Sequence, residues 1–103
     1  MDHTPTDGFF YVGQPIPKHN PNRLKAGHTT NLKRRSRDFR CASPDFVWLK
    51  TYPATKKLET RMLTRLRVKF SFIGKEVMEV QNYQDVVDAC DEFFEGFLNL
   101  AVQ

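Results

Sequence analysis

Three side chains spread along the chain could act together on a phosphate ester: the phenol of Tyr11, the guanidinium of Arg35 and the carboxylate of Glu59. A phenol has a pKa of about 10, so it needs a nearby cation before it can take a proton from water at neutral pH. A guanidinium presents a rigid fork of donors to phosphate oxygens, and carboxylates are common ligands of Mg²⁺. Together these groups could cut a phosphodiester bond.

Two further candidates, Lys25 and His28, lie beside the glycine that ends the short run 23–27. The imidazole of His28 could accept a proton near neutral pH, and Lys25 lies three residues before it. Gly27 lies between them, at the turn from a strand into a helix. The histidines and cysteines of the chain do not have the spacing of zinc ligands.

The elements that must position these side chains follow from periodicity and turn residues. Alternating and β-branched runs predict strands over 8–12, 23–27 and 46–52, and the Pro- and Asn-rich segment 13–22 predicts a loop that makes the first two antiparallel. Helices are expected over 31–40, over 53–66 with Pro53 at the first turn, and over about 84–101. Residues 67–80 are ambiguous between strand and loop.

These elements predict a small α+β fold, a β-β-α-β-α domain with a three-stranded antiparallel sheet flanked by helices and an extra C-terminal helix. We expect one domain over 8–103, with a core over 8–66, and a flexible tail over 1–7.

Glu59 falls inside the apolar arc of the helix predicted over 53–66, near Met62 and Leu66. A carboxylate that faces inward is costly unless it is paired or bound to a metal. The plainer alternative is a glutamate at the helix edge that turns to solvent or pairs with an arginine. Glu59 is the only acid in the segment 46–75, which favours a specific role.

Arg35 lies at the margin of a core-facing stripe. On the helix predicted over 31–40, Leu32 and Phe39 define that stripe, and Arg35 precedes Phe39 by four residues. Arg34 is expected to point to solvent. A guanidinium at the core margin can present fixed donors to a phosphate. From periodicity alone, the plainer alternative is that Arg35 is one more cation on a basic face. Tyr11 by itself is likewise typical of a core tyrosine whose hydroxyl reaches solvent.

The charge is strongly segregated along the chain. Residues 18–75 hold all 16 Lys and Arg but only three acids, a net charge of +13. Such a segment repels itself unless a polyanion is near, so nucleic acid is the leading partner. A solvated basic surface and a face that docks an acidic protein are the alternatives. The candidate backbone-binding residues are Lys33, Arg34, Arg37, Arg40, Lys56, Lys57 and Arg61.

The sequence also indicates in which cellular compartment the protein is expected. No apolar stretch approaches the ~20 residues of a membrane span, and the first residues lack the basic and apolar regions of a secretory signal. Cys41 and Cys90 are isolated, which favours reduced thiols. We therefore expect an intracellular protein, cytoplasmic or at the nucleoid or nucleus, that is neither secreted nor bound to a membrane.

With these residues in view, the chain resembles the GIY-YIG nuclease superfamily, and most of all the phage and fungal branch in which the second motif reads Lys-x-Gly. Phe9-Phe10-Tyr11 stands where the family has Gly-Ile-Tyr, and Lys25-Ala26-Gly27 stands where it has Tyr-Ile-Gly. Arg35 falls on the family's helix arginine and Glu59 on its metal-binding glutamate. The resemblance covers about residues 8–66.

Two positions depart from the common pattern. Lys25 replaces the second tyrosine and is followed by His28, a combination similar to that in some GIY-YIG restriction enzymes. Phe39 stands where many members carry a histidine after the arginine. These departures concern proton transfer more than the fold.

The resemblance implies a metal-dependent endonuclease that hydrolyses DNA phosphodiesters with one metal ion. Glu59 would hold Mg²⁺ or Mn²⁺, and Arg35 would contact the phosphate. Tyr11, helped by His28, would take the proton from water, and Lys25 would lower the pKa of the phenol.

Several alternatives stay open at this point. The chain could be a GIY-YIG-like module that binds nucleic acid without cutting it, and RNA remains an alternative to DNA. Sequence specificity is either slight or supplied by a second copy of the chain or by a partner protein.

Overall fold

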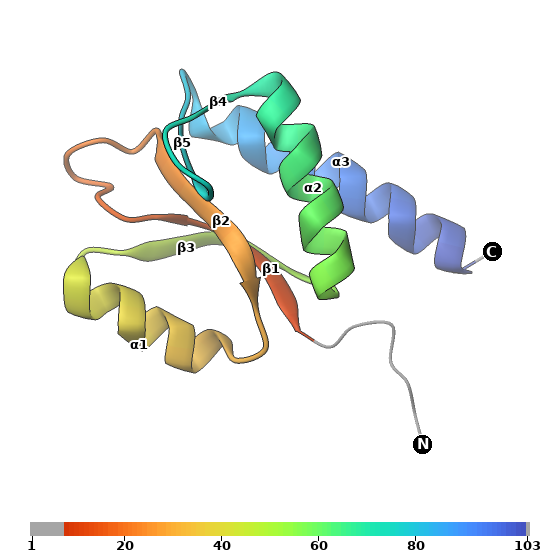
Figure 1. The fold of residues 1–103 in the computed structure, drawn as a ribbon, viewed down its shortest axis with the longest axis horizontal. Helices are drawn as coiled ribbons and strands as arrows, with labels where there is room; N and C mark the ends of the chain where they lie inside the picture. Colours follow the sequence, from red (N-terminus) through yellow and green to blue (C-terminus); the bar gives the residue numbers. More distant parts are fainter. Residues whose placement is uncertain (1–7, 103) are drawn as a thin grey trace.

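A computed structural model describes residues 8–102, with side chains through residue 96; the tail predicted over 1–7 lies outside the described residues. The elements follow the order β1 (Phe9–Gln14), β2 (Arg23–Thr29), α1 (Leu32–Ala42), β3 (Val47–Pro53), α2 (Lys56–Lys69), β4 (Ser71–Phe72), β5 (Val77–Glu79) and α3 (Tyr83–Val102). Figure 1 shows α1 apart from α2 and α3, with the sheet between them.

The strands form one antiparallel sheet in the order β3-β1-β2-β5-β4. This confirms the α+β class, but the predicted three-stranded sheet is wrong, because the sheet has five strands. The two extra strands come from the ambiguous segment, where β4 and β5 form a hairpin that adds to β2. Strands of two and three residues are too short to show a period of two in the sequence.

The register gives the sheet two different faces. Phe10 lies opposite His28 on β2 and Tyr52 on β3, whereas Tyr11 lies opposite Gly27 and Thr51. Successive side chains of a strand point to opposite faces, so Phe10 and Tyr11 face different layers.

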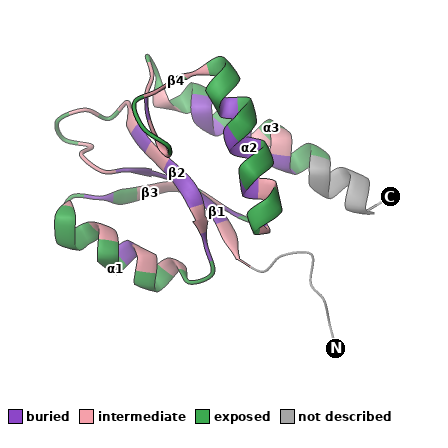
Figure 2. Cartoon of the chain, viewed as in Figure 1, coloured by how far each residue is buried: buried purple, intermediate pink, exposed green. Residues whose placement is uncertain are grey.

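The Phe10 face carries the main core, packed under α2 and α3. Phe94 of α3 stacks on Tyr52 with ring centroids 4.6 Å apart and lies 5.5 Å from Phe10. Figure 2 shows the buried positions along β1 and β2 and on the inner sides of α2 and α3. The buried core residues are Phe10, Val12, Leu24, Ala26, Tyr52, Ala54, Met62, Leu63, Leu66, Met78, Val86, Cys90 and Phe94.

The Tyr11 face is covered by α1 through a smaller group of aromatic rings. Phe39 of α1 packs edge-on against Tyr11 at 5.7 Å and lies 4.7 Å from Phe46. Trp48 lies 5.0 Å from Tyr11 and 4.9 Å from Phe46. Edge-to-face and tilted pairs at these distances are the favourable aromatic geometries.

Side-chain caps set where the two shorter helices begin. The Asn31 side chain accepts a hydrogen bond from the Arg34 amide and caps α1, and the Thr55 side chain does the same for α2 with the Leu58 amide. The prediction that Pro53 opens the second helix is wrong. Pro53 ends β3, an edge strand of the sheet, where proline is tolerated.

Candidate active site

Tyr11 is buried, with only 2 % of its surface exposed, and its phenol lies across the backbone of Gly27. A Cβ atom at residue 27 would come within 2.7 Å of the Tyr11 Oη and 3.0 Å of its Cζ. No glycine of the described chain has a positive φ, so Gly27 is needed here for this close approach and not for its backbone conformation.

The charges of three residues from three different segments act on the Tyr11 hydroxyl. Burial raises the pKa of Tyr11 well above its ordinary value, and the negative charge of Glu76 raises it further. The guanidinium of Arg35 acts in the opposite direction, and Glu59 adds a smaller upward effect. The structure thus brings the predicted tyrosine, arginine and glutamate into one electrostatic neighbourhood.

Glu59 faces inward, as the helical periodicity predicts. It lies in the first turn of α2 and is 2 % exposed. Its Oε1 lies 2.8 Å from the Nζ of Lys56, whose own side chain is 70 % exposed. A buried carboxylate that has a partner avoids most of the cost of burial, and this partner can leave for solvent because it is mostly exposed.

Arg35 is half-buried, whereas Arg34 is exposed, again as predicted. The Arg35 guanidinium carbon lies 5.8 Å from the centroid of the Phe39 ring, and the Lys25 Nζ lies 5.5 Å from the same centroid. A cation within about 6 Å of a ring centroid is attracted to the ring. Phe39 therefore holds two cations near the phenol that it packs against.

Lys25 forms an ion pair in this structure, and Arg35 is the cation that acts on the Tyr11 hydroxyl. The Lys25 Nζ lies 3.6 Å from Glu76 Oε1, so its charge is paired with a carboxylate. The cation that lowers the pKa of Tyr11 is Arg35.

His28 is not brought to the Tyr11 hydroxyl. β1 and β2 pair in one continuous register through Gly27, so the glycine does not reset the alternation of side chains. His28 therefore lies on the Phe10 face, opposite to Tyr11, and its Nε2 is 3.0 Å from the carbonyl oxygen of Ala54. There it links the end of β2 to the short connection between β3 and α2.

Glu76 is a site residue that the sequence analysis missed. It lies in the turn before β5, and its carbonyl oxygen accepts a hydrogen bond of 2.9 Å from the Ala26 amide. A Cβ atom at Gly27 would lie 3.3 Å from its Oε2, beside the Tyr11 hydroxyl. The sequence offered no signal for this placement, because the hairpin that carries Glu76 was itself not predicted.

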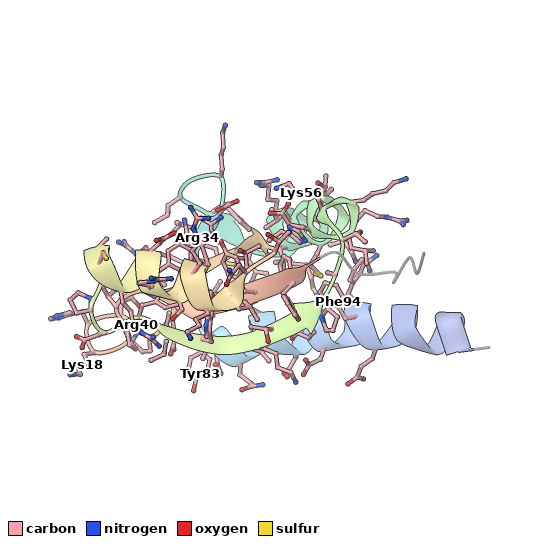
Figure 3. The ribbon with its side chains drawn as sticks, turned by 90° about the horizontal axis from the view of Figure 1, so that it is seen from below. Lys18, Arg34, Arg40, Lys56, Tyr83 and Phe94 are labelled. Atoms are coloured by element: carbon pink, nitrogen blue, oxygen red, sulfur yellow. The ribbon has the colours of Figure 1, made fainter. Side chains whose placement is uncertain are left out.

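The candidate backbone-binding cations are exposed on α1 and α2. Figure 3 shows Arg34 and Lys56 along one side of the molecule and Tyr83, at the start of α3, along the other. Arg40 is turned partly toward the protein, since its Nε donates a hydrogen bond of 3.4 Å to the Phe46 carbonyl oxygen. The other exposed members are Lys33, Arg37, Lys57 and Arg61.

The donors at this site fit a hard divalent cation. Glu59 and Glu76 are the two carboxylates whose charges reach the Tyr11 hydroxyl, and carboxylate oxygens are the ligands that Mg²⁺ prefers. In the described part of the chain, no group of three or more His, Cys, Asp or Glu residues gathers as a metal site. The buried carboxylate of Glu59 fits an ion that would take a single protein carboxylate and keep water and substrate as its other ligands.

No protein-family model matches the chain, and neither a curated protein nor a solved structure is significantly similar to it. None of its helices, within the described residues, has both the length and the apolar character needed to cross a membrane. What the chain does must therefore be inferred from the residues of the site.

Proposed function

We propose that this chain is a metal-dependent endonuclease that hydrolyses DNA phosphodiester bonds by a GIY-YIG-type mechanism. The observation that carries the proposal is that Arg35 and Glu59, from two different helices, both act on the buried hydroxyl of Tyr11. A phenol, a guanidinium and a buried carboxylate within electrostatic range of one another are groups that can activate water and bind a phosphate.

Each residue has a distinct task in this mechanism. Glu59 would hold a divalent cation, and the chemistry that this ion would supply is Lewis acidity at the leaving 3′-oxygen. Arg35 donates to the non-bridging phosphate oxygens and offsets the negative charge that grows in the transition state. Tyr11 orients the attacking water and receives its proton.

Lys56 gives this site two states. Its ammonium pairs with Glu59 at 2.8 Å, so a divalent cation would compete with Lys56 for the same carboxylate. Because its side chain is 70 % exposed, Lys56 can exchange that partner for a DNA phosphate when the cation binds.

The exposed cations of α1 and α2 supply affinity for the sugar–phosphate backbone. Contacts to phosphate carry no sequence information, so these residues bind duplex without reading it. In this proposal specificity is slight or comes from a second copy or a partner protein. The chemistry of the groups would act on RNA as well, so RNA is the alternative substrate.

Nicking of supercoiled plasmid with Mg²⁺ or Mn²⁺, with and without EDTA, tests the proposal. The expected result is nicking that EDTA abolishes, together with duplex binding that weakens steeply with salt. The second candidate is a GIY-YIG-like module that binds nucleic acid without cutting it, and it is favoured by the Lys56–Glu59 pair, which neutralises the metal ligand. Salt-sensitive binding to DNA and RNA without cleavage of either would select that candidate.

A further inference from the structure

A groove runs between α1 and the edge strand β3, next to the aromatic rings that α1 covers (Figure 1). Its volume is about 680 Å³, within the range of ligand sites. Trp48 and Leu49 of β3 line one side, and Leu32 and Ser36 of α1 line the other. Within the described chain β3 pairs only with β1, so no further strand covers this edge of the sheet. The groove has no role in the mechanism proposed above.

The cations around this groove form a row. Lys33, Arg37 and Arg40 are four and three residues apart on α1, so they lie on one side of the helix and span about 10 Å. Lys33 and Arg40 line the groove, and a neighbouring hollow of about 750 Å³ shares both and extends to Arg37. Lys50 of β3 adds a cation from the opposite side. None of the described residues that line the two hollows is acidic.

Two of these cations have partners that leave them able to bind phosphate. The Arg40 Nε donates to the Phe46 carbonyl oxygen, which leaves the other donors of the guanidinium. The Lys50 Nζ lies 3.1 Å from Asp91 Oδ1, and the Lys50 side chain is 47 % exposed. The hydroxyl of Tyr52 donates to the same Asp91 oxygen at 2.7 Å. Asp91 therefore keeps a partner when Lys50 exchanges it for a phosphate.

Trp48 adds an aromatic surface at the same place. Its ring lies 4.9 Å from Phe46 and 5.0 Å from Tyr11, which fixes the indole, and the partly exposed side chain lines the groove. A fixed aromatic ring in a positively charged groove suits single-stranded nucleic acid, because bases stack on the ring while the cations follow the phosphates. The bases of a duplex are stacked on one another, and an acidic peptide offers charge without bases.

We propose that this groove binds a single-stranded DNA segment, with a base stacked on Trp48 and phosphates held by the cations of the groove. Only β1 separates β3 from β2, which places the groove edge about 10 Å from Gly27 and the Tyr11 hydroxyl above it. The segment is the unpaired strand of a forked or flapped duplex that is cut near the junction. This choice of substrate rests on the proposed nuclease function, whereas binding of the single strand does not.

Trp48 is the only tryptophan of the chain, so its fluorescence reports on the groove directly. Titration with oligothymidylate, which forms no duplex, should quench this fluorescence in the presence of EDTA, where metal-dependent cleavage does not intervene. A hairpin duplex and polyglutamate of matched charge should quench it much less at the same salt concentration. Absence of quenching by oligothymidylate, or equal quenching by polyglutamate, overturns the proposal.

Lys50→Ala tests the groove, and Lys69→Ala is a matched control. Lys69 is an exposed lysine at the end of α2, outside the groove. Lys50→Ala should weaken oligothymidylate binding and lower the slope of log K against log salt by about 0.7, the value for one phosphate contact on a single strand. Lys69→Ala should leave the slope unchanged. Equal changes in the two variants overturn the groove, because bulk charge then explains the binding.

Cleavage of a forked duplex distinguishes the groove from the nuclease proposal. The wild type should cut the fork about tenfold faster than a blunt duplex of the same sequence, and Lys50→Ala should lose most of that preference. Equal rates on fork and blunt duplex overturn the choice of substrate. Quenching by oligothymidylate without cleavage of either duplex overturns the nuclease proposal and supports the groove. Cleavage without quenching overturns the groove alone.

Discussion

The Tyr11 hydroxyl reaches the charged groups around it only because residue 27 has no side chain. We expect Gly27→Ala to push the phenol out of place, because the added methyl group would lie 2.7 Å from its Oη. Overpacking of this kind costs about 1–3 kcal/mol, and the displaced hydroxyl should lower cleavage by more than the loss of stability explains. Thermal unfolding and plasmid nicking measure the two effects.

Gly74→Ala is the matched control for this substitution. Nothing lies within 4 Å of a Cβ atom at residue 74, and its φ is not positive. This variant should keep the stability and the cleavage rate of the wild type. Equal losses in the two variants would mean that the approach of Tyr11 to the backbone is not what makes a glycine necessary at position 27.

Arg35 is half-buried and its neighbour Arg34 is exposed. Substituting each in turn therefore distinguishes a specific role from an effect of bulk charge. Arg35→Ala should lower turnover by roughly 100-fold or more, the cost of removing one preorganised donor from the transition state. Arg34→Ala should mainly weaken duplex binding, because Arg34 is exposed. Single-turnover rates at saturating DNA distinguish the two. Comparable losses of rate in both would show that the basic run acts only through its charge.

Single residues could be predicted where periodicity decides their direction. The helical arc predicted that Glu59 faces inward, and the stripe of Leu32 and Phe39 predicted a half-buried Arg35; the structure confirms both orientations. The pairing of Lys25 with Glu76 could not be predicted, because it depends on a contact between segments far apart in the sequence. The side of the sheet on which His28 lies depended on whether Gly27 interrupts the strand, which the sequence does not decide.

At the scale of elements, the Thr55 cap fixes the start of α2 and therefore the position of Glu59 in its first turn. Thr55→Ala removes the acceptor for the Leu58 amide and should lower the free energy of unfolding by about 1 kcal/mol. Thr64→Ala is the control, since the exposed Thr64 bonds only to a carbonyl one turn earlier in the same helix. Chemical denaturation measures both, and equal effects would show that the cap does not set the helix start.

The longer elements were predictable and the short hairpin was not. β1, β2 and β3 carry enough alternating residues to be recognised, although their ends differ from the prediction by one or two residues. β4 and β5 have two and three residues, and they are strands because they pair with each other and with β2. Because the hairpin carries Glu76, the sequence that did not predict the hairpin did not predict Glu76 as a candidate site residue either.

For the whole molecule, the buried thiol of Cys90 predicts that the free energy of unfolding falls as the pH rises into the alkaline range. Burial raises the pKa of Cys90 to about 12, with a smaller contribution from the charge of Asp91. In the unfolded chain a thiol ionises near pH 8.5, so above that pH the unfolded state binds fewer protons than the native state. Stability contributed by the neutral thiol is complete below about pH 8.5 and is lost at about 1.4 kcal/mol per pH unit up to the native pKa.

Denaturation between pH 8 and 11 tests this expectation. Cys90→Ala should flatten the dependence of stability on pH in that range, whatever it does to stability at neutral pH, whereas Cys41→Ala should leave the slope unchanged because Cys41 is exposed. Tyr11 and Tyr52, whose pKa values burial also raises, add a further loss above about pH 10. A slope that is the same in both cysteine variants would contradict the assignment to Cys90.

Plasmid nicking by Glu59→Gln beside the wild type tests the central claim most directly. The substitution keeps the shape of a side chain that is only 3 % exposed but removes the charge that would hold the cation. Glu95→Gln, at an exposed position of α3, is the control. We predict metal-dependent nicking by the wild type and the control, with duplex binding but essentially no nicking by Glu59→Gln. Metal-dependent nicking by Glu59→Gln at the wild-type rate would contradict the account.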